Sequence, residues 1–352
     1  MVKISLNENV SKLKEKSKAK NTQDKYNGDW LKFIDYCKNK YNCSPLDVDD
    51  LESAYALTAN YMDWLHEDPE AKILKGTSNI PGREKLNNNP YSSSAYKAST
   101  IQRILASITY KYRVNGFQFD RKNPNISETI SAIVRDEKNN KSGQAKELLK
   151  ADIENIINKI PDDNDDFRNI RDKALILIGF YSFCRRSELL GMKYEHLNFE
   201  DDGVQVLIPF SKTDQKGEGR MIYLPKNNSP YCPVSALKNW LDVALIDSGP
   251  LFYKINKANN IEKYILNNKN QKVSLTDTSF VLILKKRAED AGIENCDKIS
   301  GHSLRIGSIT QARMNGVPTH EIMAQSGHKT TQMIDRYTKL SNIRETSAAK
   351  KI

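Results

Sequence analysis

A set of polar side chains recurs between apolar segments in the second half of this sequence. Arg185 and Arg186 directly follow the apolar stretch ALILIGFYSFC, where a buried arginine is costly unless it meets an anion. His302 and Arg305 in GHSLR stand three residues apart and would share one face of a helix. The other members of the set are Glu188, Lys212, His328 and Tyr337. Arginines to clamp phosphate oxygens, a lysine and histidines to move protons, and a tyrosine hydroxyl suit the attack of a phenolate on a phosphodiester.

Each residue of the set is common by itself, so alternatives for single positions stay open. Lys216 stands close to Lys212, and spacing alone does not choose between these two lysines. Tyr337 lies at helical spacing from Met333 and Ile334, a pattern that is also typical of a core residue. The order and spacing of the whole set must therefore carry the interpretation.

The histidines and cysteines argue against a metal site. His320 and His328 lie eight residues apart, with no cysteine or carboxylate cluster beside them. The five cysteines are scattered and none forms a CxxC pair, which argues against a disulfide framework and a zinc site: Cys37, Cys43, Cys184, Cys232 and Cys296. We therefore expect a reduced, intracellular protein without a bound metal.

The charge of the chain favours an acidic partner. The 352 residues carry a formal net charge of +10, which makes a polyanion such as nucleic acid a plausible partner. No apolar run has the length of a membrane span, and the N-terminus lacks the apolar core of a signal peptide. The sequence predicts a cytoplasmic protein that makes no contact with a membrane.

The elements that must position the polar set fall into two halves. The first half predicts helices only, at about 22–37, 47–65, 100–116 and 126–134, with Ser99 or Thr100 as the N-cap of the third and a long loop at 67–94. The stretch 135–145, RDEKNNKSGQA, predicts an extended linker. The second half predicts a hairpin of strands at 204–209 and 220–224 among helices at about 150–160, 166–182, 233–245, 279–291 and 303–315, and two short ones beyond.

The order of the polar set resembles that of the tyrosine recombinases, the phage-integrase family of site-specific DNA recombinases. The family's first arginine box is similar to FCRRSELLGMKYEHLNF, and this match selects Arg185 over Arg186, with Glu188 at an acidic supporting position. The family hairpin that bears the active-site lysine is similar to GVQVLIPFSKTDQKGEGRMIYLP, where that lysine falls on Lys212.

The resemblance continues in two further boxes and in the first half. The HxxR box is similar to GHSLRIGSIT, and the closing box to SGHKTTQMIDRY, where His328 and Tyr337 occupy the matching positions. A DNA-facing helix of Cre-type recombinases is similar to TIQRILASITYKYRVNGF. On this helix the resemblance implies DNA-binding residues at Gln102, Arg103, Lys111 and Arg113.

The resemblance implies a mainly α fold with a small β-sheet. An N-terminal helical core-binding domain and a C-terminal α/β catalytic domain would form a C-shaped clamp around duplex DNA. The implied boundaries are a flexible basic arm at 1–21, which could also touch DNA, the DNA-binding domain at 22–136, a linker at 137–147 and the catalytic domain at 148–352.

The resemblance also implies a mechanism. Tyr337 would attack the scissile phosphate and leave a 3′-phosphotyrosine and a free 5′-hydroxyl, which later attacks the partner strand. Lys212 would protonate the departing oxygen, and His302 would assist proton transfer at the tyrosine. The other residues would stabilise the transition state: Arg185, Arg305 and His328 directly, and Glu188 as their support. Because the covalent link conserves the bond energy, neither ATP nor a metal is implied.

The implied partners are double-stranded DNA with a specific, inverted-repeat site, and three further copies of the chain, in a tetramer on two synapsed sites. The segment SNIRETSAAKKI is a candidate for exchange between protomers. The gene would be of bacterial, phage or plasmid origin. A type IB topoisomerase shares the chemistry, but it does not fit the Cre-like N-terminal half. A DNA-binding architectural protein could share the fold, but it would not need the tyrosine. The sequence leaves open whether the reaction is integration, excision or resolution.

Overall fold

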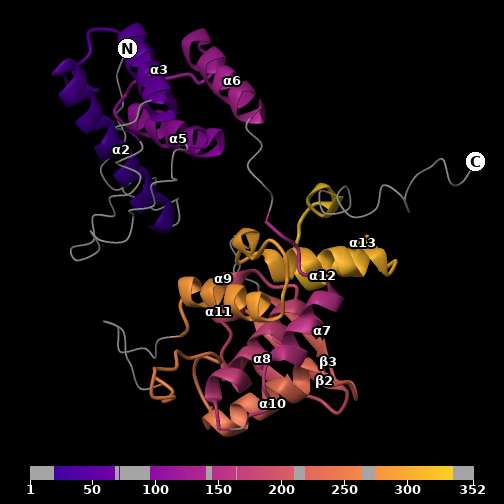
Figure 1. Ribbon diagram of the computed structural model, residues 1–352. Coiled ribbons are helices and arrows are strands. Elements are labelled where there is room, and N and C mark those ends of the chain that lie inside the picture. Colours follow the sequence, from indigo (N-terminus) through magenta and orange to yellow (C-terminus); the bar gives the residue numbers. More distant parts are fainter. Residues whose placement is uncertain are drawn as a thin grey trace, which may run out of the picture. The chain divides into compact units, whose positions relative to one another are not determined.

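The computed structural model describes residues 20–67, 71, 96–139, 145–163, 165–209, 219–263 and 274–335. The chain divides into two compact units, Met1–Ser142 and Gly143–Ile352 (Figure 1). Each unit has its own apolar core. None of the helices among the described residues is long and apolar enough to cross a membrane.

The N-terminal unit is built from helices whose apolar positions repeat at helical spacing, as the sequence predicts. The helices among its described residues are α2 (Lys20–Tyr41), α3 (Leu51–Glu67), α5 (Ala98–Val114) and α6 (Pro124–Asn139). Helix α5 packs against the other three. Its fully buried Tyr112 lies against Phe33 of α2 and stacks on Phe119, so aromatic side chains fill much of this core.

Two local predictions for the N-terminal unit are wrong. Helix α5 begins at Ala98 rather than at Ser99 or Thr100, and Lys97 at its N-cap makes no side-chain capping bond. Instead, the backbone N–H of Ala98 donates to the carboxylate of Glu137 on α6, at 2.9 Å. Helix α6 continues to Asn139, so the first residues of the expected extended linker are helical. Both errors have one cause, because an acidic residue of α6 caps α5 from a distance in sequence that local patterns do not reveal.

The C-terminal unit places most of its helices where the sequence predicts them. Its helices are α7 (Lys150–Lys159), α8 (Phe167–Tyr181), α9 (Arg186–Leu190), α10 (Pro233–Ala244), α11 (Asp277–Asp290), α12 (Ser303–Met314) and α13 (Thr319–Ser326), with short 3₁₀ turns η1 (Tyr194–His196) and η2 (Cys296–Lys298). Helix α8 is the centre of the unit, since α7, α9, α10 and α12 all pack against it. Asp166 caps α8 by accepting the backbone N–H of Arg168 at 3.0 Å.

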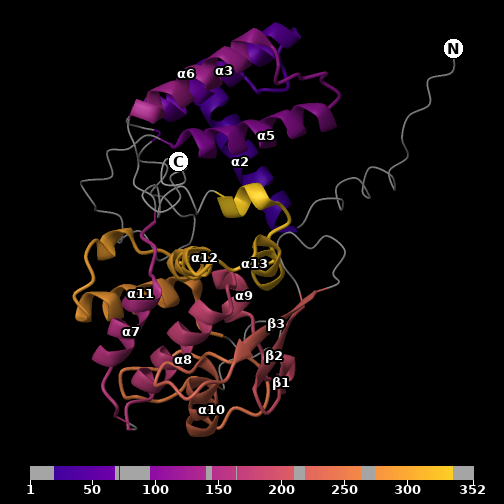
Figure 2. The ribbon, with the colours of Figure 1, turned by 90° about the vertical axis from the view of Figure 1, so that its right-hand side faces the viewer.

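The sheet has three antiparallel strands in the order β1–β2–β3. The predicted hairpin is confirmed as β2 (Gly203–Ile208) and β3 (Arg220–Pro225), which pair from Gly203 with Pro225 to Ile208 with Arg220. The edge strand β1 (Leu197–Phe199) was not predicted, because three largely exposed residues carry no clear alternation. In Figure 2 the sheet lies on one side of the unit, and α7 and α11 lie on the other.

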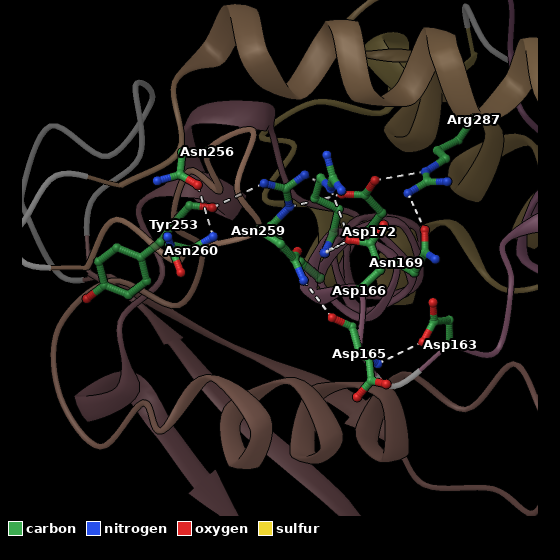
Figure 3. Close-up of polar contacts among 12 residues, drawn as sticks. Asp163, Asp165, Asp166, Asn169, Asp172, Tyr253, Asn256, Asn259, Asn260 and Arg287 are labelled. Carbon is green, nitrogen blue, oxygen red and sulfur yellow. Dashed lines mark hydrogen bonds and ion pairs between the residues drawn. The ribbon is translucent and has the colours of Figure 1, made fainter.

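A buried ionic network joins α8 to α11 on the side away from the sheet. Asp172 accepts hydrogen bonds from Arg171 at 2.7 Å and from Arg287 of α11 at 2.8 Å (Figure 3). Arg287 also donates to Asn169 at 2.7 Å, and Arg171 donates to the carbonyl of Tyr253 at 3.3 Å. Because each charge meets a partner, the network fixes the two helices to each other without leaving an unpaired buried ion.

Candidate active site

The first arginine box is organised by the carboxylate of Glu188. Arg185 precedes α9, and its guanidinium donates to Glu188 at 2.8 Å while its backbone N–H donates to the same carboxylate at 2.9 Å. Glu188 is 6 % exposed. Burial opposes its ionisation, but hydrogen bonds and charge from Arg220 and Arg185 together hold the pKa of Glu188 below its ordinary value. Arg186, the alternative at this box, pairs instead with Asp277 at 2.7 Å.

The second arginine of the predicted set, Arg305, contacts the segment before Arg185 at Phe183, a residue with an unfavourable backbone conformation. Arg305 on α12 is 3 % exposed, and it donates to the carbonyl of Phe183 at 2.6 Å. Phe183 has a φ of 56°, in the left-handed region that side chains other than glycine rarely adopt. This conformation lies two residues before Arg185, so the turn after α8 fixes the carbonyl that meets Arg305 and leads into the first arginine box.

His328 is buried beside Arg305. The Nε2 atom of its ring lies 3.0 Å from a guanidinium nitrogen of Arg305, and its Nδ1 lies 2.8 Å from the hydroxyl of Ser326. The same guanidinium nitrogen also lies 3.3 Å from Nδ1. Since a guanidinium can only donate, the neutral ring accepts from it at the nearer nitrogen, Nε2, in the tautomer whose Nδ1 proton is donated to Ser326. Burial, followed by the charges of Arg305, Arg185 and Arg220, lowers the pKa of His328 to about 4. The ring is therefore neutral at neutral pH.

His302 lies at the N-terminal end of α12, one turn before Arg305. Desolvation and the positive charges of Arg305, Arg186 and Arg185 lower the pKa of His302 below its ordinary value. A neutral imidazole beside a cationic cluster is suited to accept a proton at neutral pH.

Comparisons with known proteins identify the family of the chain. Residues 146–344 match the model of the phage integrase family. The chain belongs to this family, that of the tyrosine recombinases. It is 32 % identical over 336 residues to the integrase/recombinase xerD homolog of Selenomonas ruminantium, covering 94 % of this chain and 84 % of that protein. It is 23 % identical over 252 residues to the tyrosine recombinase XerA of Pyrococcus furiosus, covering 71 % of this chain and 72 % of the relative.

Solved structures support the fold of this tyrosine recombinase. The site-specific recombinase XerH, bound to palindromic difH substrate in a post-cleavage complex, superposes with a TM-score of 0.58 at 16 % identity, covering 93 % of this chain and 78 % of XerH. The Tn1549 transposon integrase in complex with transposon right end DNA gives a TM-score of 0.51 at 14 % identity, covering 88 % and 94 % of the two chains. The predicted mainly α fold with a small sheet is confirmed, and family membership supports site-specific DNA recombination as the activity.

Lys212 and Tyr337 lie outside the described residues, but the structure describes the chain on both sides of the segment with Lys212 and the chain that leads up to Tyr337. Ile208 and Arg220 pair at the end of β2 and β3, so the segment with Lys212 leaves and rejoins the sheet at this pair. Ile334 is fully buried in a cluster with Ile309 of α12 and Ile322 of α13, three residues before Tyr337. Both predicted residues are therefore tethered close in sequence to elements that carry the arginine and histidine groups.

Arg220 is a site residue that the sequence did not reveal. It opens β3, and its guanidinium donates to Glu188 at 3.0 Å and to the thiol sulfur of Cys184 at 3.5 Å. Its signal in the sequence was a single charge at the start of an apolar strand, RMIYLP. The contact of this side chain with Glu188 becomes visible only in the structure, where the start of β3 packs against the first arginine box.

The four residues predicted to bind DNA do not share one face of α5. At 3.6 residues per turn, Gln102 and Arg113 lie on nearly the same face and are both exposed, whereas Lys111 lies on the opposite face. Arg103 is engaged within the unit, where it forms an ion pair with Asp29 of α2. The hydroxyl of Ser107 also donates to Asp29, at 2.8 Å.

One group among the described residues has the spacing of metal ligands. Ligand atoms of His66, Glu67 and Asp136 lie within 4.8 Å of one another in the N-terminal unit. The Nε2 atom of His66 lies 3.1 Å from Asp136 and 3.2 Å from Glu67, so these contacts also link the end of α3 to α6. The two carboxylates are exposed, and we assign the group this structural role.

Proposed function

We propose that this chain is a site-specific recombinase that cuts and rejoins duplex DNA through a 3′-phosphotyrosine intermediate and a Holliday junction. The observation that carries the proposal is the convergence of Arg185, Arg305 and His328 around Glu188 within a family whose chemistry is strand exchange. Two arginines, Arg185 and Arg220, pair with the one carboxylate of Glu188, and Arg305 donates to the carbonyl of Phe183 close by in the sequence. The cationic groups therefore outnumber this carboxylate, which suits the charge of a phosphorane.

In this mechanism the hydroxyl of Tyr337 attacks the scissile phosphorus and its proton passes to His302. The bond from phosphorus to the 5′-oxygen breaks, and Lys212 supplies the proton that the departing oxygen needs. The 5′-hydroxyl of a partner strand then attacks the phosphotyrosine, which restores a phosphodiester and releases the tyrosine. No external energy source enters, because each ester bond that breaks is replaced by another.

Phosphate binding would change the hydrogen bonds of His328. Without DNA its Nε2 accepts from Arg305, so it has no proton there to donate. A phosphate oxygen would compete for the Arg305 donors, and its negative charge would raise the pKa of His328 from about 4 toward neutrality. His328 would then donate to the phosphate as the charge on the oxygens develops.

We further propose that the chain binds DNA carrying an inverted-repeat site and that four copies of the chain act on two such sites. The motivation is the palindromic substrate named for XerH and the symmetry that such DNA imposes on a bound protein. Strand exchange on paired sites is also what separates this proposal from a type IB topoisomerase, which relaxes supercoils but exchanges no strands.

The test is covalent adduct formation on a nicked substrate that traps the phosphotyrosine. The wild-type chain should give an adduct that resists denaturation, and Tyr337→Phe should bind the same DNA without forming it. Tyr223→Phe is the matched control, since Tyr223 is a half-buried tyrosine of β3 and should leave the adduct unchanged. An adduct that survives in Tyr337→Phe would mean that another nucleophile acts.

A further inference from the structure

Three segments of the C-terminal unit meet on the guanidinium of Arg220. One of its nitrogens, Nη2, donates to Glu188 at 3.0 Å and to Cys184 at 3.5 Å, both in the first arginine box. The backbone of Gly327, directly before His328, covers the guanidinium so closely that a Cβ at this glycine would lie 2.9 Å from Nη1. Gly327 also has a φ of +68°, a conformation that favours glycine, and a side chain there would push the Arg220 guanidinium aside. Arg220 thus joins β3 to the elements that carry Arg185 and His328.

The guanidinium of Arg220 is mostly buried, with 15 % of its side chain exposed. Its Nε and Nη1 atoms are buried, and neither has an acceptor in the part of the chain that the structure describes. Buried donors without acceptors lower stability, so packing alone gives no reason to keep an arginine here. A role for Arg220 must therefore act through the group that it does bind, the carboxylate of Glu188.

That carboxylate is shared between two arginines. Arg185 binds one oxygen of Glu188 through its side chain at 2.8 Å, and Arg220 binds the other at 3.0 Å. The second oxygen also accepts the backbone N–H of Arg185. Without Arg220, no described residue of β3 would bind the second oxygen of Glu188. The carboxylate could then rotate, and its contacts with the side chain and the backbone N–H of Arg185 would be weakened.

We infer that Arg220 is a positioning residue, which holds the Glu188 carboxylate in place so that Arg185 keeps its orientation toward the scissile phosphate. This inference rests on the proposed function. Among the described residues, the groups that act on Glu188 are Arg185 and Cys184 from the segment before α9, Arg220 from β3 and His328 from the turn after α13. Arg305 of α12 lies against His328. Among these, Arg220 and Arg185 favour the ionised carboxylate most directly.

The first experiment measures single-turnover adduct formation against pH for Arg220→Met and Arg220→Lys. Removing the charge should slow the reaction roughly tenfold or more near pH 7 and move the acidic limb of its pH profile upward, because Glu188 then holds its proton more tightly. The lysine variant keeps the charge and should keep the position of that limb. Arg287→Met is the control, since Arg287 also bridges two elements through a carboxylate but lies away from Glu188. It should lose stability without moving the profile.

The second experiment is a double-mutant cycle with Glu188→Gln. If Arg220 acts through Glu188, Arg220→Met should slow a Glu188→Gln enzyme much less than it slows the wild type. An equal loss in both backgrounds, or a wild-type pH profile in Arg220→Met, would overturn the inference.

A third readout does not depend on catalysis. Glu188 has a lowered pKa in the folded state, so the stability it contributes is present at neutral pH and is lost as the pH falls through that pKa. Urea unfolding should therefore show Arg220→Met to be more destabilised near pH 7 than near pH 4. If the wild-type chain forms no adduct but Arg220→Met still shows this pH-dependent destabilisation, the proposed function is contradicted. The contact of Arg220 with Glu188 would then still stand. A pH-independent difference would contradict the inference itself.

Discussion

Lys212 and the two arginines of the site are expected to stabilise different atoms of the transition state. A 5′-alkoxide needs a proton as its bond to phosphorus breaks, whereas a thiolate, with a pKa near ~8.5 for cysteine-like thiols, does not. An ammonium can supply that proton, and a guanidinium rarely can. Lys212→Ala should therefore cleave ordinary DNA slowly and recover on a substrate with sulfur at the bridging 5′ position.

Arg185→Ala and Arg305→Ala are the matched comparisons for that measurement. Their role is to stabilise charge on the nonbridging oxygens, which the sulfur substitution leaves in place, so neither variant should recover. Single-turnover cleavage rates on the oxygen and sulfur substrates decide the question. Equal slowness of Lys212→Ala on both would exclude Lys212 as the general acid and direct attention to Lys216 or His302.

The lowered pKa of His328 predicts how stability depends on pH. The folded protein holds the ring neutral down to about pH 4, whereas the unfolded chain protonates it near its ordinary pKa. Stability from this residue is therefore complete above the unfolded pKa and falls as the pH drops from there toward 4, by roughly 3 kcal/mol. Urea unfolding of His328→Gln should show a flatter pH dependence across this window than the wild type. Equal slopes would mean that the ring is not held neutral.

Local spacing predicts contacts within a motif but not contacts between motifs. Arg185 and Glu188 lie three residues apart, so their ion pair follows from helical geometry. The meeting of Arg305 with the carbonyl of Phe183, and of Arg220 with Glu188, depends on how α8, α12 and the sheet pack. No periodicity records that packing, and for this reason the sequence offered Arg185, Glu188 and Arg305 as candidates but not Arg220, which contacts Glu188 from β3.

At the scale of elements, Gly307 on α12 makes a close approach possible. Leu148, just before α7, donates its backbone N–H to Ser303 at 3.3 Å, and a Cβ at position 307 would lie 1.7 Å from the carbonyl oxygen of Leu148. Gly307→Ala must therefore displace one of the two backbones and should destabilise the chain by about 1–3 kcal/mol, the usual range for overpacking. The displacement should also slow adduct formation, since α12 carries Arg305.

Gly28→Ala is the control for Gly307→Ala, and it should stabilise the chain rather than destabilise it. Gly28 lies inside α2, and a Cβ there would meet no atom within 4 Å. Alanine should stabilise the helix by roughly 0.5–1 kcal/mol because it lowers the conformational entropy of the unfolded chain. Thermal unfolding of the two variants beside the wild type tests the pair. Stabilisation by Gly307→Ala would contradict the close approach.

Elements with a long apolar repeat were predictable, and elements set by distant contacts were not. The bounds of α7, α10 and α12 agree with the prediction to within a residue, because each carries a regular apolar stripe and a clear end. The start of α5 depends on Glu137 of α6, and β1 exists only because β2 offers it an edge. The local sequences of α5 and β1 therefore do not reveal these interactions, because the partner residues lie elsewhere in the chain.

At the scale of the whole molecule, the division into two units follows the change of composition near residues 135–145. The predicted boundaries at 136 and 147 stay predictions, as does a role for the first 21 residues, most of which lie outside the described part of the chain. What composition does establish is the charge of +10. A net positive charge favours contact with DNA, and the salt dependence of that contact follows from the number of phosphates that basic residues neutralise.

The last prediction concerns this salt dependence. A protein that neutralises many phosphates releases their counterions, so the logarithm of the binding constant should fall with the logarithm of salt concentration, at roughly −0.9 per phosphate contacted. Arg113→Ala should reduce the slope by about one if the face of α5 with Gln102 and Arg113 lies on the DNA backbone. Lys111→Ala is the matched control on the opposite face and should leave the slope unchanged. Arg103 is unsuitable for this test, because its removal would leave the mostly buried Asp29 without its ion pair. A reduced slope in Lys111→Ala alone would assign the opposite face of α5 to DNA, and an affinity independent of salt would exclude a cationic clamp.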